Sequence, residues 1–151
     1  MTGSEIVVAA SDLCFGCGKQ NPCGLKLEFK WDGKVVKSEF TPTELHQGWQ
    51  GIIHGGILIS LLDEAMAYAA YYENVGGVTA AIETRFKQPV PIGEPLTITA
   101  WVSNKTRRFA ETEGTLTLKD YTIVTTAKAK QYLSSETIIP AGRVGRPTGD
   151  A

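Results

Sequence analysis

The sequence has almost no net charge and no long hydrophobic run, and both absences exclude classes of function. The formal net charge is −1 over 151 residues, so no basic field indicates a nucleic-acid partner. A membrane-spanning helix needs about 18 consecutive apolar residues; no apolar run is that long, and the uncharged run 48–62 contains Gln50 and His54. The N-terminus has an acidic residue where a signal peptide carries positive charge. We therefore expect a cytoplasmic protein without a nucleic-acid or membrane partner.

Cysteine and histidine are scarce, with three and two copies. Cys14, Cys17 and Cys23 lie close together near the N-terminus, and an odd number without an export signal argues against a disulfide framework. The Cys-x-x-Cys pair could begin a zinc site, but four ligands are normally needed and no second Cys or His pair follows at a suitable spacing. The surrounding glycines, Asn21 and Pro22 favour a tight turn. We expect no metal site and no cofactor.

The second half of the chain lacks a helical period and reads as strands. Four segments rich in Val, Thr, Ile and aromatic residues predict strands at 79–88, 96–104, 109–119 and 122–133. Before them, residues 25–31 alternate apolar and polar as a half-buried strand does. Asp32-Gly33 predicts a hairpin turn and 35–40 the returning strand, followed by a loop at 41–51.

One helix is predicted, and it is apolar on all sides. Residues 57–72 read ILISLLDEAMAYAAYY, in which Ser60, Asp63 and Glu64 are the clearly polar side chains apart from the tyrosines. Such a helix belongs inside a fold, and a buried carboxylate is costly unless it is paired or used. Gly55 and Gly56 leave backbone N–H groups accessible at the positive end of the helix dipole. Together these features indicate acyl chemistry.

Two strands, one buried helix and four further strands predict an α+β fold. We expect an antiparallel sheet of about six strands wrapped around one long central helix. Residues 1–133 are expected to form a single domain, with 1–24 as a leading segment. Residues 134–151 are expected to be a mobile tail that carries no chemistry.

The sequence resembles the hotdog-fold thioesterases, specifically the phenylacetyl-CoA/4-hydroxybenzoyl-CoA thioesterase branch. The resemblance rests on the run from His54-Gly55-Gly56 to Ala65, on 48–51, and on the proline-containing 85–93, and 14–25 is similar to the leading segment of one group in that branch. It spans most of residues 13–133. It implies a hotdog fold and hydrolysis of an acyl-CoA thioester to free acid and coenzyme A, with coenzyme A as part of the substrate.

The resemblance also implies roles for particular residues. The Gly55 N–H would polarise the thioester carbonyl, and Asp63 would activate water or attack the carbonyl directly. Thr79, on the strand after the helix, would orient the water or the acid. His54 would have a supporting structural role, although its ring could also face the thioester.

Other residues are candidates for substrate binding. Gly56 and Phe86 are placed there by the resemblance, and Glu64 could act as a second acid or pair with a basic group across a dimer. Helical periodicity alone does not choose between Asp63 and Glu64; the resemblance implies Asp63, by the family's spacing between the glycines and the acid. The remaining candidates, for the coenzyme A phosphates, form a basic turn that could equally be a solvated hairpin end: Lys105, Arg107 and Arg108.

The distance between Gly55 and Asp63 predicts an assembly. The two residues are eight positions apart, or about 12 Å along a helix, so one carbonyl carbon cannot contact both. If both act on one substrate, they belong to different protomers of a two-fold dimer with two shared sites. A dimer and a tetramer both remain open.

Three questions stay open at the level of sequence. Some relatives place an Asn at the position of Gly48 to hold the water, and Gln47 or Gln50 would have to substitute for it. The side chains Trp49, Met66, Tyr68, Tyr71 and Phe86 fit either an acyl pocket or the core. The alternative function is a non-catalytic acyl-CoA-binding sensor on the same fold; hydration or dehydration of a 3-hydroxyacyl thioester ranks last.

Overall fold

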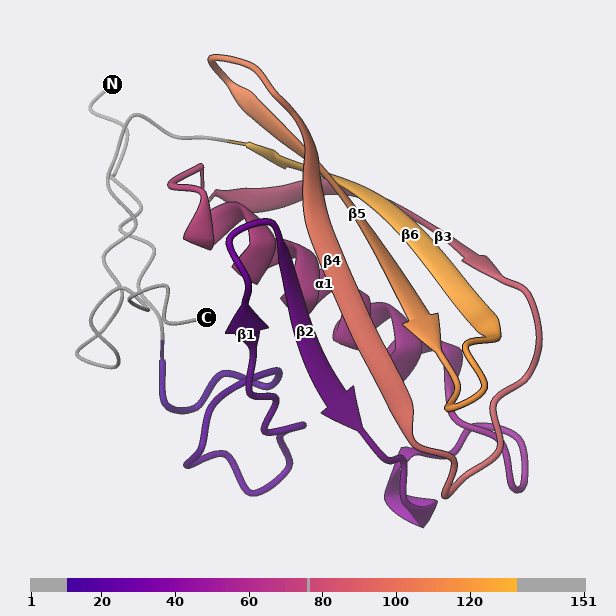
Figure 1. Cartoon of the computed structure of the whole chain (residues 1–151). Helices are drawn as coiled ribbons and strands as arrows, with labels where there is room; N and C mark the ends of the chain where they lie inside the picture. The colour runs from indigo at the N-terminus through magenta and orange to yellow at the C-terminus, as the bar shows by residue number, and fades with distance from the viewer. Residues whose placement is uncertain (1–10, 76, 133–151) are drawn as a thin grey trace.

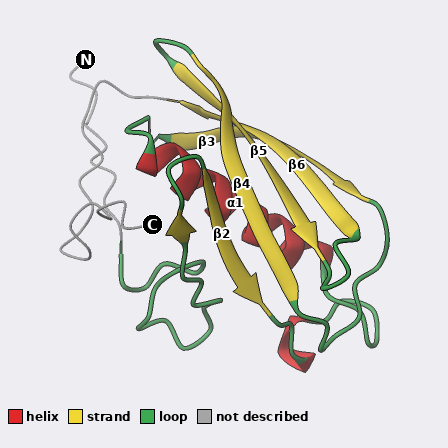
Figure 2. Cartoon of the chain, in the orientation of Figure 1, coloured by secondary structure: helices red, strands yellow, loops and turns green. Residues whose placement is uncertain are grey.

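The computed structural model describes residues 11–75 and 77–132. The predicted tail at 134–151 lies outside the described residues. The described chain forms one antiparallel sheet in the order β1-β2-β4-β5-β6-β3, and the sheet wraps around a single long helix, α1 (Figures 1 and 2). The elements are β1 Lys30–Trp31, β2 Val35–Phe40, the 3-10 helix η1 Glu44–His46, α1 Gly55–Tyr72, β3 Val78–Phe86, β4 Leu96–Lys105, β5 Phe109–Thr117 and β6 Ile123–Tyr132. The predicted α+β architecture is confirmed.

Helix α1 lies against the sheet through one face. The side chains that it buries there are Leu58, Leu61, Leu62, Ala65, Met66, Ala69 and Ala70. Gly114 of β5 allows this close packing, because a Cβ on Gly114 would lie 3.0 Å from the Leu62 side chain and 3.5 Å from Met66. Met66, a candidate for the acyl pocket, is thus a fully buried core residue.

The opposite face of α1 is less covered than the sequence predicted. Asp63 is half-buried and not fully buried, because a single sheet covers only one side of the helix. Neighbouring strand β3 is similarly open: it is an edge strand, and its apolar side chains Val78, Ile82 and Phe86 are 52%, 37% and 52% exposed. Among the described residues, no helix is long and apolar enough to cross a bilayer.

The strand predicted at 25–31 is mostly wrong. Only Lys30–Trp31 forms a strand, because Lys26 has a positive φ of 53°, which an extended strand does not allow. The N–H groups of Leu25 and Leu27 instead bond the carbonyls of Phe15 and Gly16. The apolar alternation had a different cause: Leu25 and Leu27 are core residues.

The remaining predicted elements are confirmed. The Asp32-Gly33 turn has Gly33 at φ 97° and joins β1 to β2, which covers the predicted 35–40. The four later strands end within two residues of the predicted limits. The loop at 41–51 contains η1, which the sequence pattern did not indicate.

Candidate functional site

The first turn of α1 offers one uncommitted backbone donor. The N–H groups of Ile57 and Leu58 both bond the His54 carbonyl, and the Gly56 N–H bonds the His54 ring. The Gly55 N–H has no hydrogen-bond partner among the described residues. It stands at the positive end of an 18-residue helix, where a carbonyl oxygen that gains negative charge is stabilised.

His54 is the N-cap of α1. Its Nδ1 accepts the Gly56 N–H at 2.8 Å, so the ring satisfies one of the free donors of the first turn. A Cβ on Gly56 would lie 3.0 Å from Nδ1. Gly56 therefore leaves room for the ring to cap the helix. This contact agrees with the supporting role that we expected for His54.

Phe86 lies beside the free donor. A Cβ on Gly55 would be 3.5 Å from the Phe86 ring, and this ring is half exposed at the end of β3. An acyl thioester whose carbonyl approached the Gly55 N–H would therefore meet an aromatic surface. The structure thus places Gly55 and Phe86, two of the predicted site residues, together.

Asp63 and Thr79 are a second pair of predicted site residues that the structure brings together. The Thr79 hydroxyl donates a hydrogen bond to Asp63 Oδ1 at 2.8 Å, linking the middle of α1 to the start of β3. This bond leaves the second carboxylate oxygen of Asp63 available to a water or a carbonyl carbon. The side chains are half-buried, which keeps them within reach of a ligand.

A β-bulge in β3 makes the Asp63–Thr79 contact compatible with the rest of the strand. Thr79 pairs with Gln131 and Ala81 with Lys130, so Ala80 is an extra residue. Thr79 and Ile82 are three positions apart and would face opposite sides of a regular strand. Because of the bulge, both face α1, and the bulge thus directs Thr79 at Asp63.

Gln131 is a polar residue of this region that sequence reasoning missed. It is fully buried and is the register partner of Thr79, so both side chains lie on the face of the sheet toward α1. Its Oε1 accepts from the Thr112 hydroxyl at 3.1 Å, but its Nε2 has no partner among the described residues. The strand pattern gave no signal of this, because Gln131 occupies an ordinary alternating position of β6.

The Gly55–Phe86 pair and the Asp63–Thr79 pair lie apart within one protomer. Gly55 and Asp63 are both on α1, eight residues and about 12 Å apart. Their neighbours Phe86 and Thr79 lie near opposite ends of β3. The described chain therefore has a donor end, which carries Gly55 and Phe86, and an acid end, which carries Asp63 and Thr79.

Glu64 points away from this pair toward the N-terminal cysteines. Its Oε1 accepts a hydrogen bond from the Cys14 thiol at 3.6 Å. Burial raises the pKa of the Cys17 thiol to about 12, and the Glu64 carboxylate adds to the increase. Cys17 is thus a protonated, weakly nucleophilic thiol at neutral pH. The sequence did not indicate that Glu64 meets the cysteines, since fifty residues separate them.

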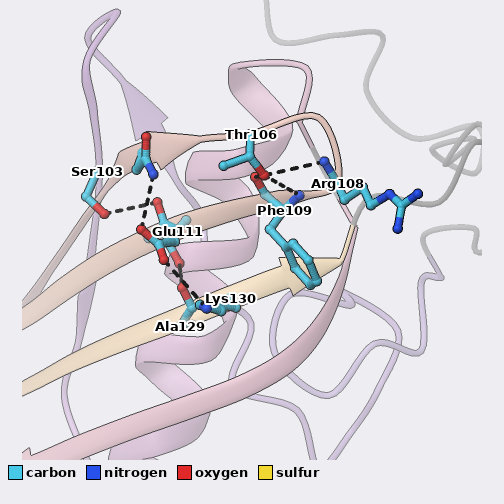
Figure 3. A network of polar contacts seen from close by, with 9 residues as sticks. Ser103, Thr106, Arg108, Phe109, Glu111, Ala129 and Lys130 are labelled. Atoms are coloured by element: carbon cyan, nitrogen blue, oxygen red, sulfur yellow. Dashed lines mark hydrogen bonds and ion pairs between the residues drawn. The ribbon is translucent and has the colours of Figure 1, made fainter.

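The three predicted phosphate-binding cations lie on the turn between β4 and β5. The Thr106 hydroxyl accepts from the N–H groups of Arg108 and Phe109, which fixes the turn, and the Arg108 side chain extends away from the sheet (Figure 3). Lys105, Arg107 and Arg108 are exposed, and none of them has an ion-pair partner among the described residues. The register Phe109–Tyr132–Val78 puts this turn at the end of the sheet where β3 starts, which is also the end that carries the Thr79–Asp63 contact.

The loop before α1 leaves little room for a side chain at Gly48. A Cβ on Gly48 would lie 3.2 Å from the His54 Cα, so a larger residue would press on the N-cap. The Gln47 side-chain oxygen accepts the Gly51 N–H at 2.9 Å and is occupied within the loop. Trp49, a candidate for the acyl pocket, is 86% exposed.

Comparison with known proteins places this geometry in a family. The model of the thioesterase superfamily matches residues 50–124, which include α1 and β3. The chain belongs to the thioesterase superfamily. A search of the curated proteins finds no match.

Solved structures of thioesterases share the fold. A crystal structure of a thioesterase superfamily protein is 27% identical with a TM-score of 0.73, covering 76% of this chain and 57% of that one, so the likeness spans just over half of the longer protein. The Escherichia coli PaaI protein, from the phenylacetic acid degradation operon, is 25% identical with a TM-score of 0.67, covering 72% and 83%. A Streptococcus pneumoniae thioesterase crystallised with coenzyme A has 17% identity and a TM-score of 0.64, covering 72% and 88%. The hotdog fold predicted from the sequence is confirmed.

Proposed function

We propose that this thioesterase superfamily protein hydrolyses an acyl-CoA thioester to a free acid and coenzyme A. The observation that carries the proposal is that α1 presents both the Asp63 carboxylate and the Gly55 N–H. Thr79 of β3 donates a hydrogen bond to the carboxylate, and the N–H has no partner among the described residues. The Gly55 N–H can stabilise the oxygen of a thioester carbonyl, and the Asp63 carboxylate can attack its carbon or activate a water.

The reaction follows from these two groups. As the carbonyl carbon is attacked, its oxygen gains negative charge and the Gly55 N–H stabilises that charge. Asp63 takes a proton from the attacking water, or its free oxygen attacks and forms an anhydride that water then cleaves. In either route the C–S bond breaks, the sulfur receives a proton, and the oxygen of one water ends in the acid.

The site is proposed to be shared by two protomers. The donor end and the acid end of one chain are too far apart to act on one carbonyl, while β3 is an exposed edge strand. Long apolar edges are normally covered, and an antiparallel pairing of two copies of β3 would cover this one.

The position of the two pairs along β3 supports such a dimer. Val78 and Phe86 are the first and last residues of β3, so a two-fold axis near Ile82 would place Val78 opposite the partner's Phe86. Thr79 and Asp63 of one protomer would then approach the partner's Gly55. A dimer of this form has two equivalent sites.

The basic turn is proposed to bind the phosphates of coenzyme A. Its three cations are exposed and lack ion-pair partners among the described residues, and the turn lies at the acid end of the sheet. Arginine and lysine suit phosphate by charge and geometry. The Streptococcus pneumoniae protein, which holds coenzyme A, shows that a protein of this fold accommodates the ligand.

The test is a hydrolysis assay with a panel of substrates. Phenylacetyl-CoA, 4-hydroxybenzoyl-CoA and straight-chain acyl-CoAs are offered to the unmodified protein, to Asp63→Asn and to the control Glu73→Gln, an acid-to-amide change at the C-cap of the same helix. We expect turnover of at least one thioester, a loss of roughly 100-fold or more in Asp63→Asn, and no loss in the control. Binding of acyl-CoA without any turnover would instead favour the sensor function.

A further inference from the structure

Residues 11–29, which we call the cysteine segment, keep a defined path without any helix or strand. Such long irregular stretches are uncommon in compact domains and usually carry a function. The segment contributes only three apolar side chains to the buried core, Cys17, Leu25 and Leu27. Small structures with little core are often held by a disulfide or a metal, and none of the three cysteines, all of which the structure describes, forms a disulfide.

Three metal-binding groups meet where this segment touches α1. The sulfurs of Cys14 and Cys17 and a carboxylate oxygen of Glu64 all lie within 4.8 Å of one another. Zinc holds sulfur at about 2.3 Å and carboxylate oxygen at about 2.0–2.2 Å, which puts tetrahedral donors roughly 3.5–3.8 Å apart. The Cys14–Glu64 separation is already 3.6 Å, so side-chain movements of about 1 Å would complete the arrangement.

The backbone of the segment is shaped to bring the carboxylate in. A Cβ on Gly16, between the two cysteines, would lie 2.5 Å from Glu64 Cδ. A Cβ on Gly18 would lie 2.3 Å from the Asp12 carbonyl oxygen, and the Gly18 N–H closes the turn on the Cys14 carbonyl at 2.8 Å. Side chains at these two positions would therefore disrupt the turn or exclude Glu64.

The donor set selects the kind of ion. Two thiolates and one carboxylate suit zinc, whereas magnesium and calcium require oxygen donors. Three protein ligands leave a fourth position for water. The Tyr68 side chain hydrogen-bonds to Cys17 and stacks on Phe29 at 4.5 Å, so it can hold the sulfur in place from outside the donor set.

We propose that Cys14, Cys17 and Glu64 bind one zinc ion, which joins the cysteine segment to α1. The sequence showed the Cys-x-x-Cys pair but not the third ligand, because that ligand is a helix carboxylate fifty residues away from Cys14. The ion would brace α1 at the residue next to Asp63. The proposal does not depend on the proposed hydrolysis.

Metal content and metal spectroscopy of the full chain test the proposal. Protein purified from zinc-supplemented medium under reducing conditions is expected to contain one zinc per chain by elemental mass spectrometry. Cobalt(II) added to the metal-free chain is expected to give the intense visible bands of a tetrahedral ion and a thiolate-to-cobalt charge-transfer band. A chain that stays free of zinc and gives only the weak spectrum of hydrated cobalt would overturn the proposal, and the thiols would then be hydrogen-bond donors to Glu64 alone.

Variants test the identity of the ligands. Cys14→Ser and Glu64→Gln are expected to weaken zinc binding about 10-fold or more, while Cys23→Ser, an exposed cysteine of the same segment, keeps the affinity of the unmodified chain. An equal loss in Cys23→Ser, or none in Glu64→Gln, contradicts the assignment. Because the cobalt spectrum is recorded on the unmodified chain, the test stands even where a variant fails to fold.

Discussion

Thr79 and Thr84 lie on the same strand and the same face, yet their hydroxyls differ in use. The Thr79 hydroxyl donates to Asp63 at 2.8 Å, whereas the Thr84 hydroxyl is buried without a hydrogen-bond partner in the described part of the chain. The bulge at Ala80 produces this difference by directing Thr79 at the helix. At the scale of single residues, the candidate chemistry therefore depends on one side-chain contact.

Replacing each threonine by valine separates orientation of the acid from packing. Thr79→Val is expected to lower kcat roughly 10- to 100-fold, the equivalent of one hydrogen bond to a charged group. Thr84→Val removes an unsatisfied buried hydroxyl and is expected to leave kcat unchanged and stability equal or higher. Steady-state kinetics and thermal unfolding of both variants check this. Equal kinetic losses in the two would remove the assigned role of Thr79.

His46 makes stability depend on pH. Burial lowers the pKa of its ring, whose Nδ1 accepts the Thr43 N–H at 2.9 Å. The unfolded chain therefore takes up the proton first, so the stabilisation is complete above pH 6.5, the ordinary value, and decreases as the pH falls below it.

The matched variant is His46→Gln, which keeps an acceptor at this position of the capping box but does not titrate. Chemical unfolding between pH 7.5 and pH 5.5 is expected to show a smaller loss of unfolding free energy in His46→Gln than in the unmodified chain. Parallel curves would show that His46 contributes nothing to the pH dependence.

At the scale of elements, substitutions of His54 test whether this residue acts by capping the N-terminus of α1. Because its Nδ1 caps the Gly56 N–H, asparagine should replace it and alanine should not. We expect His54→Ala to lose about 1 kcal/mol of stability, while His54→Asn keeps both stability and most of the activity. Denaturant unfolding and the hydrolysis assay measure the two quantities. An inactive but fully stable His54→Asn would indicate that the imidazole itself contacts the thioester.

The role of the turn between β4 and β5 in phosphate binding is tested by comparing substrates with and without the phosphates. Changing Lys105, Arg107 and Arg108 to glutamine is expected to raise KM for acyl-CoA roughly 3- to 30-fold. The same change should not alter KM for a pantetheine thioester, which lacks the nucleotide phosphates. The control removes three lysines near the β1–β2 hairpin, Lys30, Lys34 and Lys37, and should leave both KM values unchanged. A similar rise for both substrates would contradict phosphate binding.

The sequence predicted elements well where local chemistry decides them. The Asp32-Gly33 turn, the helix led by Gly55-Gly56 and the four later strands follow from turn residues and periodicity. Where a distant contact decides, prediction failed. The N–H groups of Leu25 and Leu27 bond the carbonyls of Phe15 and Gly16 instead of forming a strand, and Glu64 contacts Cys14.

The candidate site shows the same limit. The resemblance supplied Asp63 and Thr79, and the structure adds their contact. No local pattern indicates that Gln131 lies beside Thr79, with an Nε2 that has no partner among residues 11–75 and 77–132, because this depends on the register of β6 with β3. Nor does composition reveal that the sheet covers α1 on one side only.

At the scale of the whole molecule, the proposed dimer would cover the open face of α1 and the exposed edge β3 with a second copy of the chain. Ile82→Lys, in the middle of β3, is expected to convert the protein to monomers without activity, because a buried lysine opposes edge pairing. Ile123→Lys, on a similarly exposed isoleucine of β6, should stay dimeric and active. Analytical ultracentrifugation and circular dichroism check the assembly and the fold. An active monomer would exclude a shared site.

Complementation between two inactive variants tests the shared site most directly. Asp63→Asn removes the acid, and Gly55→Pro removes the N–H at a helix position that tolerates proline. Each variant alone should be inactive. After the two are mixed in equal amounts, unfolded and refolded together, half of the dimers should contain both chains and one intact site of two, giving about one quarter of the unmodified activity. If the mixture contains mixed dimers but stays inactive, Gly55 and Asp63 do not act together across the two chains, and the account is wrong.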